Sequence, residues 1–465
     1  MKRVIFALFL SFSLLEAILP AKIGEFITKD KIDPFKLGIY ITKENNGEEE
    51  VIASLNEDNL FHPASVAKLF TTYGALLEYG ANFRWPTSLF YTGEVKNGIL
   101  YGDLVIKAYG DPTLSCKDVE KIAKKIASLG IKEIKGDIII DRTFFENSAS
   151  ITSNFDKNIY SQYNAMPDAL MFDDHLCRIK LLPKKGKISI ALPYPDKSLK
   201  IKNELKGVNR RCRGRYAYPK VAIGYEGVIP IVTFKGSYSL KCPPRTIRRV
   251  LTKPYLSFFY ALKSYLNQYG VKNLSKLKLK PLPKNAKRLF IHRSKPLIEI
   301  VSITNKKSNN LYARHLFLIL GTKYFGPPAT LQKSREALRI IYQKRGIWDD
   351  RTFIDNGCGL SHKSVVSPKA ILALLKDAKD NLGMRWLNTL SIAGVDGTTR
   401  RRFRHSAAKN RAWLKTGTLK RAKNIAGYVL SKNGNFYKVV IFYNGAKIWL
   451  AKLLQDQIID YLAKE

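Results

Sequence analysis

A serine and a lysine stand three residues apart in the segment HPASVAKLF, residues 62–70. A serine hydroxyl is a poor nucleophile at its ordinary pKa and needs a neighbouring base to accept its proton. A lysine amine can be that base once burial or a nearby cation favours its neutral form. On a helix, positions i and i+3 project on the same side, so Lys68 can approach the Ser65 hydroxyl. The pair is therefore a candidate for acyl transfer through a serine nucleophile.

The spacing alone is weak evidence, because S-x-x-K occurs three times in the chain, at Ser65, Ser275 and Ser406. Ser275 lies in a basic segment broken by prolines, and Ser406 lies in the short polar piece HSAAKN. Only Ser65 opens a long segment with apolar residues at helical spacing. These residues are Leu69, Phe70, Tyr73, Leu76 and Leu77. The local context therefore selects Ser65.

Two further groups complete a candidate site for cleaving a peptide beside a terminal carboxylate. Such a reaction needs a second hydroxyl to relay protons, an amide to hold the substrate backbone and a cation for the carboxylate. Ser308-Asn309-Asn310 supplies the hydroxyl and the amides at a predicted helix start. The one K-T-G of the sequence, Lys415-Thr416-Gly417, lies in a strand-like run. Gly417 removes a side chain where a substrate could follow the strand edge.

The elements that must position these residues come from both ends of the chain. Residues 37–42 and 50–55 alternate in polarity around a polar turn and predict a hairpin. Three strand-like runs, 412–419, 425–431 and 436–444, precede a final amphipathic helix. Together they predict one antiparallel sheet, with helices between residues 302 and 390 to pack against it.

The middle of the chain has a different sequence pattern. From about residue 95 to 250 it consists of short strand-like pieces separated by Pro and Gly turns. This pattern predicts one or two inserted β-rich domains. The basic segment 272–288 is interrupted by prolines and is expected to be a loop or a sheet edge.

Composition and the N-terminus indicate an exported protein. The 79 Lys and Arg outnumber the 38 Asp and Glu, which gives a net charge of +41 and favours polyanionic surroundings. Lys2 and Arg3 precede an apolar run and small residues, the layout of a secretory signal with cleavage after Ala21; an uncleaved anchor remains open. Export argues against a nucleic-acid partner.

Five cysteines cannot all pair within one exported chain. Cys212 with Cys242 is the disulfide to test first. The sequence contains neither C-x-x-C nor H-E-x-x-H, so it gives no support for a metal site or a cofactor.

The ordered set S-x-x-K, S-x-N and K-T-G resembles the penicillin-recognising serine enzymes. Further segments extend the likeness to the low-molecular-mass class C penicillin-binding proteins, the D-alanyl-D-alanine carboxypeptidase/endopeptidase family (peptidase family S13). These segments are GDPTL (110–114), YNAMPDALMF (163–172), DNGCGLS (355–361) and AGVDGT (393–398). The resemblance covers nearly the whole mature chain in order. Cys358 departs from it, since small residues such as serine are usual there.

The resemblance implies an α/β (α+β) fold: a serine β-lactamase/DD-peptidase-like domain with a five-stranded antiparallel sheet flanked by helices, plus inserted β-rich domains. Together with the patterns above, it predicts a signal peptide at 1–21, a discontinuous peptidase domain at 22–94 and 251–465, and the β-rich insertion at 95–250.

The resemblance also implies catalytic roles. Ser65 attacks the carbonyl between two D-alanines and forms an acyl-enzyme, with Lys68 as its base. Ser308 passes the proton toward the leaving amine, and Lys415 tunes that hydroxyl. Penicillin would acylate the same serine.

Substrate binding is implied for four further residues. Asn310 should bind the substrate amide, and Gly417 should leave the strand edge open. Thr416 and Thr418 would hold the terminal carboxylate, and the N–H groups of Ser65 and Thr418 would form the oxyanion hole.

The expected partners are peptidoglycan stem peptides and cross-bridges, with β-lactams as inhibitors. The expected place is the periplasm or cell envelope, with peripheral association to an anionic membrane or wall polymer. Neither a metal nor a cofactor is expected.

Two other functions stay open at this point. A serine β-lactamase must hydrolyse its acyl-enzyme quickly, and class A enzymes use a glutamate for that step. Between Ser308 and Lys415 the one glutamate is Glu336, without the accompanying E-x-x-x-N pattern. A non-catalytic wall-binding protein could use the basic surface alone, although the intact triplet argues against it.

Overall fold

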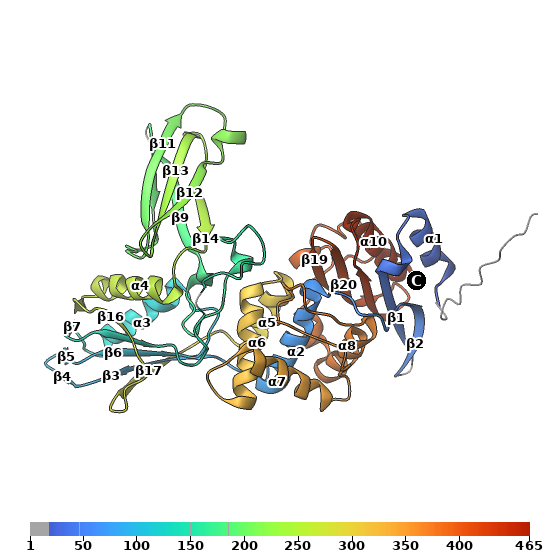
Figure 1. Ribbon diagram of the computed structural model, residues 1–465, viewed down its shortest axis with the longest axis horizontal. Coiled ribbons are helices and arrows are strands. Elements are labelled where there is room, and N and C mark those ends of the chain that lie inside the picture. Colours follow the sequence, from blue (N-terminus) through green and yellow to red (C-terminus); the bar gives the residue numbers. More distant parts are fainter. Residues whose placement is uncertain (1–17, 46, 149, 185) are drawn as a thin grey trace, which may run out of the picture. The chain divides into compact units, whose positions relative to one another are not determined.

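The computed structural model describes residues 18–465 except 46, 149 and 185 (Figure 1). Most of the predicted signal peptide lies outside the described residues. The chain divides into two compact units. The first unit comprises the described residues up to 69, 347–354 and 362–465, and the second comprises 70–346 and 355–361. No helix in the described part of the chain is both long and apolar enough to cross a bilayer.

A six-stranded sheet with the order β18-β19-β20-β21-β1-β2 forms the centre of the first unit (Figure 1). Its strands are β1 (Leu37–Asn45), β2 (Glu48–Leu55), β18 (Ser391–Ile392), β19 (Ala412–Leu419), β20 (Ala422–Leu430) and β21 (Phe436–Tyr443). All neighbouring strands are antiparallel, and β1 pairs with β21. The prediction of one antiparallel sheet from both ends of the chain is confirmed. Five strands were expected, and the sixth is β18, whose two residues are too few to produce a pattern.

Both faces of this sheet are covered by helices, which explains why β20 and β21 are almost continuously apolar. Ile425 and Val429 share a core with residues of α1 (Ala21–Lys29) and α10 (Ile448–Lys464). On the other face, the Tyr428 hydroxyl donates to the Leu375 carbonyl of α8 (Pro368–Leu382) at 2.6 Å. The short α9 (Met384–Leu387) follows α8.

Helices form one part of the second unit. They are α2 (Lys68–Tyr79), whose first two residues belong to the first unit, α5 (Leu297–Lys306), α6 (Asn310–Phe325) and α7 (Leu331–Gln343). The apolar face predicted after Ser65 is buried in α2: Phe70 packs edge-on against Tyr342 of α7, with ring centroids 5.0 Å apart. The helix predicted to begin beside Ser308 is confirmed as α6.

Four sheets form the rest of the second unit, in the orders β16-β8-β6-β3-β17, β15-β7-β5-β4, β10-β9-β14 and β11-β13-β12. Their strands are β3 (Pro86–Tyr91), β4 (Glu94–Lys96), β5 (Ile99–Tyr101), β6 (Leu104–Ala108), β7 (Glu133–Ile134), β8 (Ile138–Asp141), β9 (Cys177–Lys184), β10 (Lys187–Ala191), β11 (Lys200–Val208), β12 (Lys220–Glu226), β13 (Ile229–Ser239), β14 (Arg245–Arg249), β15 (Lys272–Asn273), β16 (Leu277–Leu279) and β17 (Lys287–Arg293). The helices α3 (Cys116–Ser128) and α4 (Pro254–Gln268) contribute to the core of the first two sheets.

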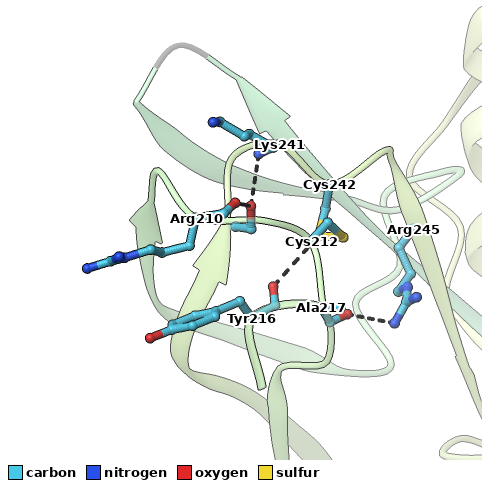
Figure 2. The surroundings of a disulfide bond; sticks show 8 residues. Arg210, Cys212, Tyr216, Ala217, Lys241, Cys242 and Arg245 are labelled. Carbon is cyan, nitrogen blue, oxygen red and sulfur yellow. Dashed lines mark hydrogen bonds between the residues drawn. A yellow bond between two sulfur atoms is a disulfide. The ribbon is translucent and has the colours of Figure 1, made fainter. Parts of the chain in front are cut away.

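Two sequence predictions about this region are confirmed. The basic segment 272–288 supplies β15 and β16, which are edge strands of their sheets. Cys212 and Cys242 form a disulfide (Figure 2). The predicted limits of the insertion, 95–250, rest on sequence motifs and on the pattern of short strands, not on the division into compact units. They stay a prediction.

Candidate active site

Ser65 lies in η2 (Ala64–Ala67), a single 3₁₀ turn that runs directly into α2. The Nζ atom of Lys68 donates a hydrogen bond to the Ser65 Oγ atom at 2.8 Å. Lys68 is 0% exposed, so its amine is kept out of bulk water. Ala64 has a φ of 49°, a left-handed conformation that costs a non-glycine residue about 1–2 kcal/mol. A buried serine–lysine pair at a strained turn is an arrangement suited to nucleophilic catalysis.

The other two S-x-x-K sites lack this arrangement. Lys278, three residues after Ser275, forms an ion pair with Asp137 at 2.6 Å. The hydrogen bond from Lys278 to that carboxylate raises the pKa of Lys278, which favours its charged form. The Ser406 hydroxyl donates to Asp460 at 2.5 Å. Only at Ser65 is the lysine both buried and hydrogen-bonded to the serine.

Lys415 is a second buried lysine of the first unit. It is 0% exposed in β19, and its Nζ atom donates to the Thr416 carbonyl at 2.9 Å. Burial lowers the pKa of Lys415 well below its usual value, and the charge of Lys68 lowers it further. The two lysines are therefore within electrostatic range of each other. A like charge disfavours the charged form of its neighbour, and the charge of Lys68 acts in this way on Lys415.

The lowered pKa of Lys415 should make stability depend on pH. The unfolded chain holds this proton up to a pKa of about 10.4, whereas the folded chain releases it at lower pH. Between these values the unfolded state binds more protons, so stability rises with pH. We expect the melting temperature of the wild type, relative to Lys415→Met, to increase as the pH rises toward about 10. Circular dichroism melts test this, and a constant difference would mean that Lys415 titrates normally.

Gly417 marks the point where β19 touches the Ser65 turn. A Cβ atom at position 417 would lie 2.6 Å from the Pro63 carbonyl oxygen and 3.1 Å from the Ser65 backbone nitrogen. Both are backbone atoms, which cannot rotate out of the way. Glycine is therefore required for the K-T-G strand and the Ser65 turn to be this close.

Gly417→Ala should displace the Ser65 turn and slow acylation by penicillin about 100-fold, because misplacement of about 1 Å can have an effect of that size. The time course of labelled-penicillin incorporation measures the rate. Gly24→Ala in α1 is the matched control, because a Cβ atom there meets nothing within 4 Å. Equal rates in the two variants would show that the close contact does not position Ser65.

The hydroxyls that follow Lys415 have partners that sequence reasoning missed. Thr416 Oγ1 donates to Thr398 Oγ1 at 2.8 Å, and Lys423 Nζ donates to Thr418 Oγ1 at 3.1 Å. Burial lowers the pKa of Lys423, as do the charges of Arg402 and Lys452. Thr398 is the last residue of the AGVDGT segment, which contributed to the family resemblance but had no role assigned to its residues. No sequence motif pointed to Lys423, because its position opposite Thr418 depends on the register between β19 and β20.

Ser308 and Asn310 belong to the second unit. Ser308 lies between α5 and α6 with a φ of 52°. The Asn309 side chain caps α6 by accepting from the Tyr312 N–H at 3.1 Å. Asn310 Nδ2 donates to the Tyr163 carbonyl at 3.0 Å. The structure thus brings Ser65, Lys68, Lys415 and Gly417 together, and the cooperation of Ser308 and Asn310 with them stays a prediction.

Groups of three or more His, Cys, Asp or Glu side chains that could hold a metal ion are absent from the described residues.

An antiparallel sheet between helices, with a buried serine–lysine pair beside a K-T-G strand, defines the class of penicillin-recognising serine enzymes. The sequence profile of the D-Ala-D-Ala carboxypeptidase 3 (S13) family matches residues 19–465. The chain belongs to this family. The family predicted from the sequence is thereby confirmed. The predicted mixed α/β fold is confirmed by the sheets and helices described above.

Similar proteins agree with this assignment. D-alanyl-D-alanine carboxypeptidase DacB of Haemophilus influenzae is 28% identical, over 86% of this chain and 84% of the relative. A D-alanyl-D-alanine carboxypeptidase of Actinomadura sp. is 26% identical, over 86% of this chain and 77% of the relative. The crystal structure of penicillin binding protein 4 of Haemophilus influenzae aligns with a TM-score of 0.77 at 24% identity, covering 95% of this chain and 99% of that one.

Proposed function

We propose that this S13-family enzyme uses Ser65 to cleave peptide bonds that follow D-alanine in peptidoglycan stem peptides. Ser65 Oγ attacks the carbonyl carbon while Lys68 Nζ accepts the hydroxyl proton. The C–N bond breaks, and Ser308 passes a proton to the leaving amine. Water then hydrolyses the ester and regenerates Ser65. The 2.8 Å hydrogen bond from a fully buried Lys68 to Ser65 is the observation that carries this proposal.

The edge of β19 supports the proposed binding mode. The short strand β18 pairs only with Trp413 and Leu414. Among the described residues, no strand pairs with Thr416, Gly417 or Thr418 on that side. An extended peptide can add to such an edge through main-chain hydrogen bonds. We infer that the substrate follows this edge, with its terminal carboxylate at Thr416 and Thr418 and its amide at Asn310.

Carboxypeptidase and endopeptidase activity should share this site. In both reactions the carbonyl of a D-alanine faces Ser65, and a carboxylate on a D-centre follows the scissile bond. The test is to incubate the enzyme with a stem pentapeptide and with a cross-linked dimer, and to resolve products by chromatography. Loss of the terminal D-alanine and cleavage of the dimer are expected. Failure to cleave either substrate, in a protein that is folded, would overturn the proposal.

A β-lactamase is the alternative within the same class, and Glu336 does not support it. Glu336 accepts a hydrogen bond from Arg339 Nε at 3.0 Å on α7. This hydrogen bond lowers the pKa of Glu336, so the carboxylate is a weaker base than usual. We therefore expect slow deacylation, with penicillin acting as an inhibitor.

We further propose that the enzyme works outside the cytoplasm, in the cell envelope. Three observations support this: the basic, apolar N-terminus, the Cys212–Cys242 disulfide typical of an oxidising compartment, and a family that acts on peptidoglycan. The charge of +41 supports peripheral, salt-sensitive association with an anionic envelope surface.

A further inference from the structure

Residues 209–219, NRRCRGRYAYP, form a strongly basic segment of the second unit that we name the arginine loop. The exposed cations of this loop are Arg210, Arg211, Arg213 and Arg215. The acidic residues between positions 197 and 253 are Glu204 and Glu226, and each already forms an ion pair with a lysine. In the described part of the chain, no ion pair neutralises these four arginines. The loop therefore presents a dense positive charge to solvent.

The arginine loop is held in place by a covalent bond and by hydrogen bonds (Figure 2). The disulfide joins Cys212 of the loop to Cys242, which follows β13. The Arg245 guanidinium donates to the Ala217 carbonyl at 2.7 Å, and the Ser239 hydroxyl donates to the Arg210 carbonyl. In Figure 2, the Arg210 side chain extends away from the disulfide. A site fixed in this way loses little conformational entropy on binding.

Two tyrosines add flat aromatic surface to this charge. Arg215 donates to the Tyr216 hydroxyl at 2.9 Å, and the Arg245 guanidinium lies 4.2 Å from the centre of the Tyr218 ring. Tyr218 is nevertheless 65% exposed. The hydrogen bond and the charge of Arg215 lower the pKa of Tyr216, which reflects the positive potential of the loop.

The composition of the loop indicates the chemistry of its partner. Arginine, unlike lysine, presents a planar fork of donors that matches a phosphate group bidentately. Tyrosine supplies rigid, amphipathic contact area suited to the faces of sugar rings. Binding into a lipid surface requires apolar side chains that enter it, and the aliphatic side chains of the loop are only Ala217, which is buried, and Pro219, which is half-buried. A phosphorylated saccharide satisfies these features better than a bilayer does.

We propose that the arginine loop binds a phosphate-bearing glycan of the cell envelope and thereby holds the enzyme near its polymeric substrate. The phosphate groups accept hydrogen bonds from Arg210, Arg213 and Arg215, and the sugars contact the tyrosines. This binding is independent of the Ser65 chemistry.

The test measures binding of the full chain to immobilised phosphomannan, with neutral mannan as the matched ligand. The variant Arg210→Glu/Arg213→Glu/Arg215→Glu should weaken binding to phosphomannan at least about tenfold. Its plot of log K against log salt should become shallower by about 2, because three phosphate contacts are lost. The control, Lys117→Glu/Lys124→Glu/Lys125→Glu, reverses three exposed lysines of α3 and changes the net charge equally. It should bind much as the wild type does.

Three results would overturn the proposal: an equal loss in both triple variants, equal binding of mannan and phosphomannan, or tighter arginine-dependent binding to phosphatidylglycerol vesicles. An equal loss in both variants would show that net charge alone explains the binding. Tighter binding to the vesicles would show that the partner is a lipid surface. Unchanged penicillin acylation shows that the Ser65 site of the arginine variant is intact, and an unchanged circular dichroism spectrum shows that the rest of the chain is folded. Ser65→Ala should keep full phosphomannan binding, so this test and that of the proposed catalytic function can fail separately.

Discussion

Release of D-alanine from a stem pentapeptide is expected to fall by about 10⁴–10⁶-fold in Ser65→Ala, because the acyl-enzyme cannot form without the hydroxyl. Alanine removes one oxygen atom from a turn whose neighbours are buried, so the fold should persist. Released D-alanine, quantified by chromatography after reaction with an amine-specific dye, gives the rate. Circular dichroism of the same sample shows whether the variant is folded.

The chain provides its own matched controls for this experiment. Ser275→Ala and Ser406→Ala change the other two S-x-x-K serines, whose settings do not suit nucleophilic attack: Lys278 pairs with Asp137, and Ser406 donates to Asp460. Both variants should retain nearly full activity. Substantial D-alanine release by Ser65→Ala, or its loss in either control, would contradict the assignment of the nucleophile.

Lys415→Ala is expected to lose trimming of the pentapeptide and cleavage of the cross-linked dimer together, each by about 10²–10⁴-fold. Lys415 is a fully buried lysine within electrostatic range of Lys68, so its removal changes the surroundings of the base as well as the proposed carboxylate site. Both effects concern interactions that the two reactions share. Parallel assays on the two purified substrates measure the losses.

Lys420→Ala is the control for this variant, because Lys420 is exposed just after β19. It should leave both rates within about twofold of the wild type, as exposed surface changes usually do. A Lys415→Ala enzyme that stopped trimming yet kept full dimer cleavage would show that the two reactions use different sites.

Patterns along the chain were sufficient to predict the sheet of the first unit. The alternation of residue types in 37–42 and 50–55 identified β1 and β2. The apolar runs of β20 and β21 reflect their burial, which follows from the helices on both faces of the sheet. The Ser65 helix was predictable for the same reason, since its apolar residues recur at helical spacing. These features depend on neighbours close in sequence or on simple periodicity.

Other features depend on contacts that a single sequence does not encode locally. The close approach of Gly417 to the Pro63 carbonyl depends on how the Ser65 turn packs against β19. The hydrogen bond from Lys423 to Thr418 depends on the register between β19 and β20. The two residues of β18 are too few for a period. From the sequence, Cys212–Cys242 was one of several possible pairs among five cysteines. The backbone around β13 is what brings these two residues together.

The most direct measurement is to map the site of acylation by penicillin. The protein is incubated with a fluorescent penicillin, digested, and its peptides are sequenced by mass spectrometry. The account predicts one adduct per chain, on the Ser65 hydroxyl, and none in Ser65→Ala. An adduct on Ser275 or Ser406, or labelling that persists in Ser65→Ala, would contradict it.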